Sequence, residues 1–134
     1  MDPAQAAADW QLCRDLKLPF FLQPPNADAA LWRLSVAQTA PVLDLPYAQF
    51  VEWQGAQRWL WAPLSAAAQI RSVAAQAGGH ATVFIANNAD GTSRNDVFDR
   101  FAPLQSPLDR IHRQLKSEFD PAGIFNPGRF YPGL

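Results

Sequence analysis

Four polar side chains in this sequence are of types that do chemistry in other proteins. Arg33 carries a planar guanidinium, which can grip a carboxylate at two points. His80 titrates near neutral pH and can accept a proton. Asn126 and Arg129 flank Pro127-Gly128, so an amide that donates and accepts lies close to a guanidinium on a rigid turn. These types suit the binding of a small anion and the removal of a proton.

Each of the four also has an ordinary structural role open to it. Arg33 would then be a solvated strand residue, and His80 a hydrogen-bonded structural residue. Asn126 would cap its own turn, and Arg129 would be a surface charge. The residue types alone do not decide between the two interpretations.

The composition excludes several classes of site. The chain has 134 residues, eleven basic and twelve acidic, so it lacks the basic surplus of a nucleic-acid-binding protein. Cys13 is the only cysteine and there are two histidines, which makes an internal disulfide impossible and a zinc site improbable. No metal site is therefore predicted. Five Trp and nine Phe predict either an apolar surface that meets a partner or a core rich in aromatics.

The N-terminal third predicts a helix and then a half-buried strand. Asp2-Pro3 suits a helix start, so a helix is expected over residues 3–15, followed by a loop from Leu18-Pro19-Phe20 onwards. Residues 31–37 alternate in the strand manner, with Trp32, Leu34 and Val36 on the core face. Arg33 and Ser35 then point away from that core. Residues 38–46 contain two prolines and are expected to form a loop.

The middle of the chain predicts a hairpin, a helix and a strand. Two aromatic-rich runs, residues 49–54 and 57–63, flank Gly55-Ala56, and Glu52 and Arg58 are expected to pair structurally across this hairpin. An alanine-rich helix over residues 65–77 should end at Gly78-Gly79. The strand at residues 80–86 is apolar on both faces, which suggests a central position in the sheet. Residues 87–96 predict a mobile surface loop, after which Phe98 and Phe101 return the chain to the body.

The C-terminal third predicts one helix and an irregular strap. Ser106-Pro107 indicates a helix start with Ser106 as N-cap, and the helix must end before Pro121. The tail has three prolines and should be ordered, because its apolar side chains need cover: Ile124, Phe125, Phe130 and Tyr131. The order of elements predicts an α+β fold, a ferredoxin-like sandwich with a mostly antiparallel sheet and helices on one face.

Four segments carry a resemblance to a known family. Residues 115–131, LKSEFDPAGIFNPGRFY, resemble the C-terminal signature of FAD-linked oxidases of the vanillyl-alcohol-oxidase type. Three further segments are similar to the FAD-binding subunit of bacterial glycolate oxidase, in the same order and at about the same spacing: 31–36 (LWRLSV), 52–60 (EWQGAQRWL) and 78–84 (GGHATVF). The resemblance runs from about residue 18 to the end. Ala37, where Pro is expected, and Phe125, in place of the more usual Leu, depart from the pattern.

The resemblance implies a cap, or substrate, domain. Residues 1–17 would be an N-terminal helix, and residues 18–134 the C-terminal domain of an FAD-linked oxidase with a flavin-facing tail at 120–134. The Gly-rich segment that cradles FAD phosphates in the family has no counterpart here, so the chain would be a fragment that is inactive alone and binds free FAD weakly or not at all. The seam to the missing domain or to a sister subunit would include Trp53, Trp59 and Trp61; core packing is the alternative.

The family also gives the candidate residues definite roles. Asn126 and Arg129 would lie at the edge of the flavin ring, where Arg129 favours negative charge or an anionic substrate. Arg33 would bind the carboxylate of a small hydroxy acid. His80 would accept the hydroxyl proton while hydride leaves for the flavin. The parent complex would oxidise glycolate to glyoxylate through FAD.

The implied partners are the FAD-binding domain, a related flavin subunit and an iron–sulfur subunit. The N-terminus does not look like a signal peptide and no apolar run could span a bilayer, so the expected location is the cytoplasm, with peripheral attachment to the inner membrane through the complex. A different class of function stays open: a free-standing ferredoxin-like module that binds a ligand or another protein.

Overall fold

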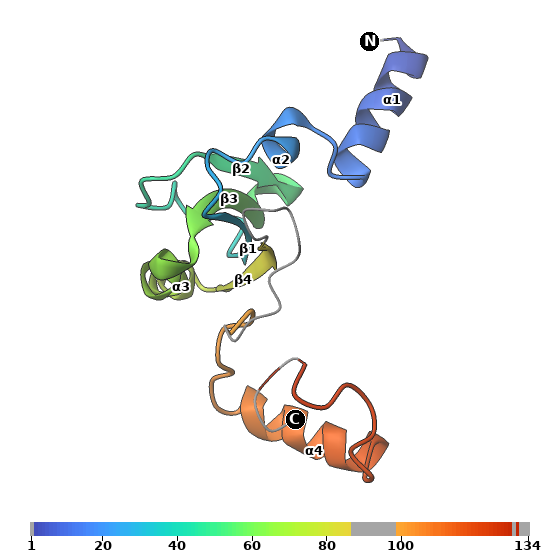
Figure 1. Ribbon diagram of the computed structural model, residues 1–134, viewed down its shortest axis with the longest axis vertical. Helices are drawn as coiled ribbons and strands as arrows, with labels where there is room; N and C mark the ends of the chain where they lie inside the picture. The colour runs from blue at the N-terminus through green and yellow to red at the C-terminus, as the bar shows by residue number, and fades with distance from the viewer. Residues whose placement is uncertain (1, 87–98, 130, 132–134) are drawn as a thin grey trace. The chain divides into compact units, whose positions relative to one another are not determined.

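The computed structural model describes residues 2–86, 99–129 and 131. The chain forms two compact units, Met1–Asn95 and Asp96–Leu134, and each is described by itself (Figure 1). The predicted loop at residues 87–96, together with Phe98 and Phe130, lies outside the described residues.

The first unit is built on a four-stranded antiparallel sheet. Its strands are β1 (Ala29–Ser35), β2 (Gln49–Glu52), β3 (Gln57–Pro63) and β4 (His80–Ile85), in the order β2-β3-β1-β4. The predicted α+β class and antiparallel sheet are confirmed. The central position predicted for residues 80–86 is wrong, because β4 pairs only with β1 among the described strands. Apolar residues on both faces of a strand indicate that other elements pack above and below it. They do not indicate a hydrogen-bonded strand on each of its two edges.

The ferredoxin-like arrangement is not confirmed. That arrangement has a helix between its first and second strands. Here the connection between β1 and β2, residues 36–48, contains neither helix nor strand. The loop predicted at 38–46 is therefore confirmed, and its presence is the reason that the sandwich lacks one of its two helices.

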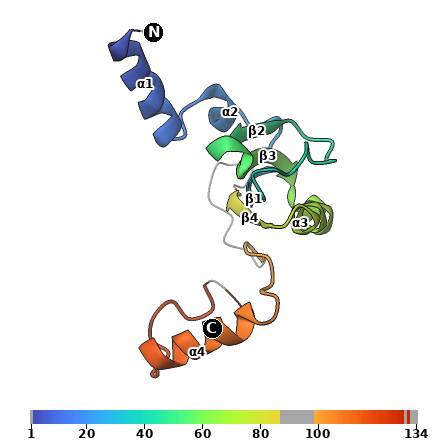
Figure 2. The same cartoon turned by 180° about the vertical axis from the view of Figure 1, so that it is seen from behind.

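The core of this unit lies on the sheet face predicted from the alternation in β1. Trp32, Leu34 and Leu60 have no exposed surface, and full burial of such a side chain stabilises a fold by about 1.5–3 kcal/mol. The Trp32 indole N–H donates to the carbonyl of Ala62 at 3.1 Å, so the polar edge of this buried ring is satisfied. Beside β4 lies the helix α3 (Ala67–Gln76), which buries Ile70 among its residues (Figures 1 and 2).

The turn from α3 into β4 brings two strands very close together. The amides of Gly78 and Gly79 donate to the carbonyls of Ala75 and Ala74, at 3.0 and 2.9 Å, which is the Schellman pattern of a helix end. Gly78 has the left-handed φ of 75° that this pattern requires. A Cβ on Gly79 would lie 1.8 Å from the carbonyl oxygen of Ser35. Only glycine fits there, and the predicted helix stop at Gly78-Gly79 is confirmed.

The predicted hairpin is confirmed, but its turn is longer than expected. The sequence predicted that Trp53 and Gln54 belong to the first strand of the hairpin. Instead β2 ends at Glu52, and Trp53–Gly55 form a single 3-10 turn, η1. Trp53 and Gln54 both have left-handed φ angles, 51° and 54°, which cost energy in residues that carry a Cβ. The hairpin turn is therefore strained, and it exposes the side chain of Trp53 to solvent, at 74% exposure.

Arg58 holds the loop before β2 and does not pair with Glu52 as predicted. It lies opposite Val51 in the ladder, so its side chain points to the other face of the sheet from Glu52. Its guanidinium is buried and donates to three backbone carbonyls, of Gly55 (3.2 Å), Pro41 (2.7 Å) and Ala40 (2.6 Å). Arg58 is structural, as predicted, through a different set of partners.

Two helices precede the sheet. The predicted first helix is confirmed as α1 (Pro3–Arg14), with the Asp2 carboxylate accepting from the amide of Ala4 at 3.4 Å. The loop predicted next contains one helical turn, α2 (Pro19–Leu22), with proline at its first position. Phe21 of this turn is buried against the sheet, and α2 lies beside β2 in both views (Figures 1 and 2).

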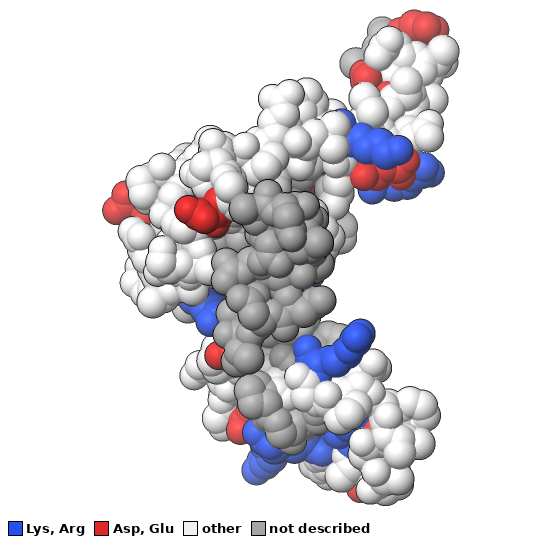
Figure 3. All heavy atoms as spheres, in the orientation of Figure 1, with Lys and Arg blue, Asp and Glu red and all other residues white. Residues whose placement is uncertain are grey.

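The second unit consists of one amphipathic helix and its C-terminal turns. The helix α4 spans Leu108–Phe119, and no side chain caps it, so the N-cap predicted at Ser106 is wrong. Basic side chains gather on α4 in Figure 3. Cover was predicted for the tail, but Ile124 and Phe125 are 68% and 62% exposed; Tyr131 is half-buried near the rings of Phe101 and His112. No helix in the described segments is long and apolar enough to cross a membrane.

Candidate functional site

The strand register places Arg33 in a row of residues on one sheet face. Arg33 of β1 lies directly opposite Trp59 of β3 and Thr82 of β4, and Phe50 of β2 lies opposite Trp59. Residues directly opposite in an antiparallel ladder point to the same face. The row therefore crosses all four strands, and Arg33 is its one charged member.

The guanidinium of Arg33 is half-buried beside an aromatic ring. Its central carbon lies 5.8 Å from the centre of the Phe84 ring, within cation–π range. No acidic side chain in the described part of the chain forms an ion pair with Arg33. A half-buried arginine with no carboxylate partner among the described residues is suited to receive an anionic group, because its fork of N–H donors matches a carboxylate.

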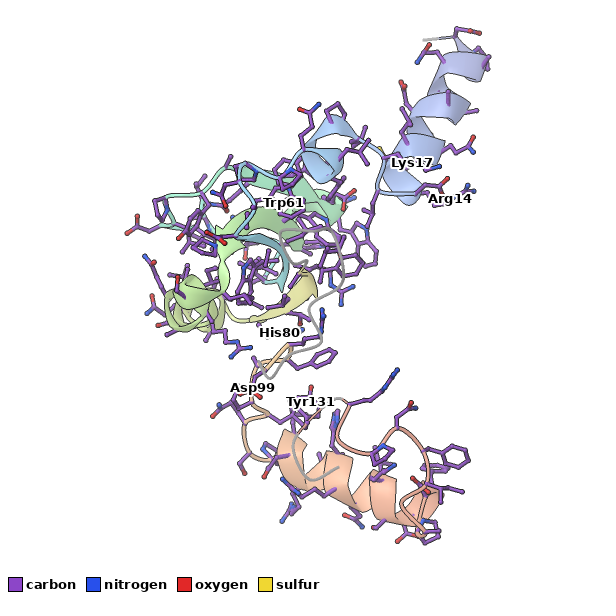
Figure 4. All side chains as sticks on the ribbon, in the orientation of Figure 1. Arg14, Lys17, Trp61, His80, Asp99 and Tyr131 are labelled. Carbon is purple, nitrogen blue, oxygen red and sulfur yellow. The ribbon has the colours of Figure 1, made fainter. Side chains whose placement is uncertain are left out.

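A second row, next to the first, is polar along its whole length. Glu52 of β2, Gln57 of β3, Ser35 of β1 and His80 of β4 face each other in sequence across the sheet. The Glu52 carboxylate accepts from the Gln57 amide at 3.0 Å and from the Trp59 indole at 2.7 Å. His80 is exposed at the beginning of β4 (Figure 4). This polar row places His80 diagonally to Arg33, about 7–8 Å away at the backbone level.

Aromatic side chains close the opposite end of the same face. Phe21, Leu31 and Trp59 form a buried cluster, and the rings of Phe21 and Trp59 meet edge to face at 5.4 Å. Trp59 also meets Phe84 edge to face at 5.0 Å, so the cluster reaches the ring beneath Arg33. Buried residues therefore lie on this face of the sheet as well as on the predicted core face. Trp59 is core, 3% exposed, and only Trp53 of the three predicted seam residues is fully available to a partner.

A shallow groove opens beyond this cluster. Its volume is about 430 Å³, and prolines and aromatic side chains line most of it: Pro19, Phe20, Gln23, Pro25, Pro46, Tyr47, Ala48 and Trp61. The Trp61 indole donates to the Phe20 carbonyl at 2.7 Å (Trp61 is marked in Figure 4). None of the four predicted site residues lines the groove.

The other two candidates lie on one turn after α4. Asn126 has a left-handed φ of 47°, and its carbonyl accepts from the Arg129 amide at 3.2 Å. Both side chains are exposed. The turn thus presents an amide and a guanidinium together, as the sequence predicted. Arg33 with His80, and Asn126 with Arg129, form two pairs in separate units.

A buried carboxylate, Asp120, supports this turn. One oxygen accepts from the amide of Ile124 at 3.0 Å and the other from the amide of Phe125 at 2.9 Å, and Lys116 forms an ion pair with it. The hydrogen bond from Lys116 lowers the pKa of Asp120 below its ordinary value, helped by the two backbone amides and against the effect of desolvation.

Analysis of the sequence missed the polar row and the role of Asp120. The row depends on the register between four strands, and the alternation in one strand cannot supply it. The role of Asp120 could have been predicted from the sequence, because Lys116 and Asp120 are four positions apart at a helix end and this spacing favours an ion pair.

The described residues fit one part of an FAD molecule and not another. Asn126 and Arg129 offer exposed donors suited to the polar edge of a flavin ring. A pyrophosphate needs a glycine-rich turn that leads from a strand into a helix. The glycines of the described segments do not provide this: Gly78 and Gly79 lead from a helix into a strand, and the others lie in the hairpin turn and the C-terminal turns.

Fold and site together define an α+β domain with an antiparallel sheet and an anion-suited, polar patch on one face. The chain is 45% identical over 125 residues to glycolate oxidase subunit GlcE of Escherichia coli (strain K12). The match covers 93% of this chain and 31% of that relative, so the chain spans about a third of the relative's length. The resemblance to a glycolate oxidase subunit is confirmed. No family model matches the chain, and no solved structure matches it.

Proposed function

We propose that this chain serves as the C-terminal, cap part of a glycolate oxidase subunit and contributes to the pocket in which glycolate is oxidised to glyoxylate. The observation that carries the proposal is the identity of 45% to GlcE across nearly the whole chain. The C-terminal placement rests on the signature at residues 115–131. Residues 18–134 act as the cap domain, and residues 120–134 as its flavin-facing tail.

In this proposal Arg33 binds the substrate carboxylate. It is half-buried, its guanidinium carbon lies 5.8 Å from the centre of the Phe84 ring, and no described acid forms an ion pair with it, so its N–H donors suit an anion. His80, diagonal to it, takes the hydroxyl proton. This assignment rests on the exposure of His80 and on its place in the polar row opposite Ser35.

Asn126 and Arg129 contact the flavin ring in this proposal. FAD, when bound, supplies the hydride acceptor. Its phosphates are held by another polypeptide segment, since no described glycine turn can cradle them. The proposed partners are an FAD-binding domain, a related flavin subunit and an iron–sulfur subunit, in a complex located in the cytoplasm and at the inner membrane.

A chimera tests the proposal. The matched stretch of GlcE is replaced by this chain, and glycolate-dependent dye reduction is measured in cells that lack their own GlcE. We expect activity well above that of cells without the chimera. No activity from a chimera that is folded and assembled would overturn the assignment to glycolate oxidase and favour a free-standing binding module.

Variants of the chimera then test the residue roles. Arg33→Gln removes the planar fork, and we expect the KM for glycolate to rise by at least about tenfold, with a smaller effect on kcat. Arg14→Gln is the matched control, because Arg14 is an exposed arginine of α1 that pairs only with its neighbour Asp15. An Arg33→Gln chimera with an unchanged KM would remove Arg33 from the substrate site.

A further inference from the structure

The end of α4 carries a closed set of polar contacts. Lys116 and Asp120 face each other one helical turn apart, and Asp120 is 7% exposed. The two carboxylate oxygens of Asp120 accept from two successive backbone amides, of Ile124 and Phe125, at 3.0 and 2.9 Å. Lys116 also donates to the carbonyl of Phe125, at 2.5 Å. Lys116 and Asp120 together therefore bind two N–H groups and one carbonyl group of the backbone at residues 124–125.

Apolar packing does not explain the shape of this segment. The side chains of Ile124 and Phe125 are mostly exposed, and a Cβ added to Gly123 or Gly128 would meet no atom within 4 Å. A segment with so little burial pays conformational entropy without compensation from the hydrophobic effect. The backbone contacts to Lys116 and Asp120 are the contacts that fix it among the described residues.

The held segment leads directly into the turn that presents Asn126 and Arg129. Phe125 precedes Asn126, whose left-handed φ of 47° reverses the chain so that the Arg129 amide reaches the Asn126 carbonyl. The orientation of this turn thus follows from the anchoring of Phe125. Asn126 and Arg129 themselves have exposed side chains that are available to a ligand.

We propose that Lys116 and Asp120 are positioning residues that preorganise Asn126 and Arg129 for contact with the flavin. The inference rests on the proposed function for the identity of the ligand. Lys116 and Asp120 act through the backbone and do not touch the cofactor, because the contacts described above occupy both groups. Preorganisation of this kind reduces the entropy lost when a ligand binds.

The first experiment measures the turn in the 134-residue chain without any flavin. Hydrogen exchange and amide chemical shifts are recorded by NMR for Ile124, Phe125 and Arg129. In Asp120→Ala we expect exchange of the first two amides to accelerate by roughly tenfold, since both lose their acceptor. Lys116→Met should loosen the same amides, and Lys116→Arg should restore them. The indole signal of Trp32 reports whether the sheet unit stays folded.

Two substitutions on the same helix serve as controls. Glu118→Gln removes an exposed negative charge two residues from Asp120, and Arg110→Gln removes an exposed positive charge. Neither should alter the three amides. Unchanged amides in Asp120→Ala, or equal changes in the controls, would overturn the positioning role.

The second experiment uses the GlcE chimera and separates this inference from the proposed function. We expect Asn126→Ala and Arg129→Gln to reduce flavin retention, Lys116→Met to reduce it in parallel, and Lys116→Arg to retain it. If Asn126→Ala and Arg129→Gln reduce retention but Lys116→Met does not, the positioning inference is wrong and the tail role stands. If Asn126→Ala and Arg129→Gln both leave retention unchanged, the tail role itself fails, whatever the amides show.

Discussion

Substitution of Gly79 by alanine should damage this protein far more than the same substitution at the neighbouring Gly78. A Cβ on Gly79 would lie 1.8 Å from the Ser35 carbonyl oxygen and 2.8 Å from the Cα of Val36, where ordinary contact begins at 3.4 Å. Both atoms belong to the backbone, so no side-chain rotation relieves the clash. The end of β1 and the beginning of β4 must therefore move apart.

The magnitudes follow from two different physical causes. Overpacking costs about 1–3 kcal/mol where side chains can adjust, and a backbone clash should reach or exceed the upper end of that range. Gly78 has space for a Cβ, whose closest neighbour would be 3.9 Å away, so Gly78→Ala costs only the left-handed conformation, about 1–2 kcal/mol. Against a typical stability of about 5–15 kcal/mol, the first change is severe and the second is tolerated.

Urea denaturation of the two variants, followed by tryptophan fluorescence, measures the difference directly. We expect Gly79→Ala to lose at least about 1 kcal/mol more free energy of unfolding than Gly78→Ala. In the chimera, Gly79→Ala should also lower activity, because β4 carries His80 opposite Ser35. Equal destabilisation by the two substitutions would refute the close approach of β1 and β4.

Three further predictions concern the core, the tail and the cofactor. Ile70→Ala should lower the free energy of unfolding by about 2–5 kcal/mol, because Ile70 is fully buried, whereas Leu115→Ala on the exposed stripe of α4 should have little effect; chemical denaturation compares them. The amides of Ile124 and Phe125, which donate to Asp120, should be released in acid. The pKa of Asp120 in the folded chain is lowered, chiefly by Lys116. The stabilisation is therefore present above the ordinary carboxyl pKa of about 3.9 and is lost as the pH falls through the lowered pKa of the folded chain. NMR titration should show this change in the parent chain and not in Asp120→Asn. The chain alone should bind free FAD weakly or not at all, and tight, stoichiometric quenching of flavin fluorescence on titration would contradict that expectation.

The elements that the sequence predicted well are those with local signals. The alternation of Trp32 and Leu34 indicated the core face of β1, and Gly78-Gly79 marked the end of α3, because side-chain period and backbone freedom act within a few residues. The helical turn at Pro19–Leu22 was missed for the opposite reason. Its stability comes from Phe21 packing on Trp59, a contact between residues far apart in the sequence.

In the candidate site too, local signals predicted one part, and the other part depends on contacts between residues far apart in the sequence. Asn126 and Arg129 were predicted to share a turn, and they do, since they are only three positions apart and Pro127-Gly128 restricts the path. The environment of Arg33 required more information. Its ring contact with Phe84 and its row with Trp59 and Thr82 depend on how β1, β3 and β4 align, and one strand's pattern is compatible with several alignments.

The two pairs of candidate residues are therefore held by different kinds of force. Arg33 and His80 project from adjacent strands of a sheet whose other face buries Trp32 and Leu34, so their separation is fixed by ladder hydrogen bonds and by this burial. Asn126 and Arg129 depend on one ion pair and a few backbone hydrogen bonds, which salt and acid weaken. If the proposed function is correct, Asp120→Ala in the chimera should reduce flavin retention, while the KM for glycolate of the flavin-loaded enzyme stays close to that of the parent chimera. A KM that rises together with the loss of flavin would contradict a substrate site on the sheet that is separate from a cofactor contact on the tail.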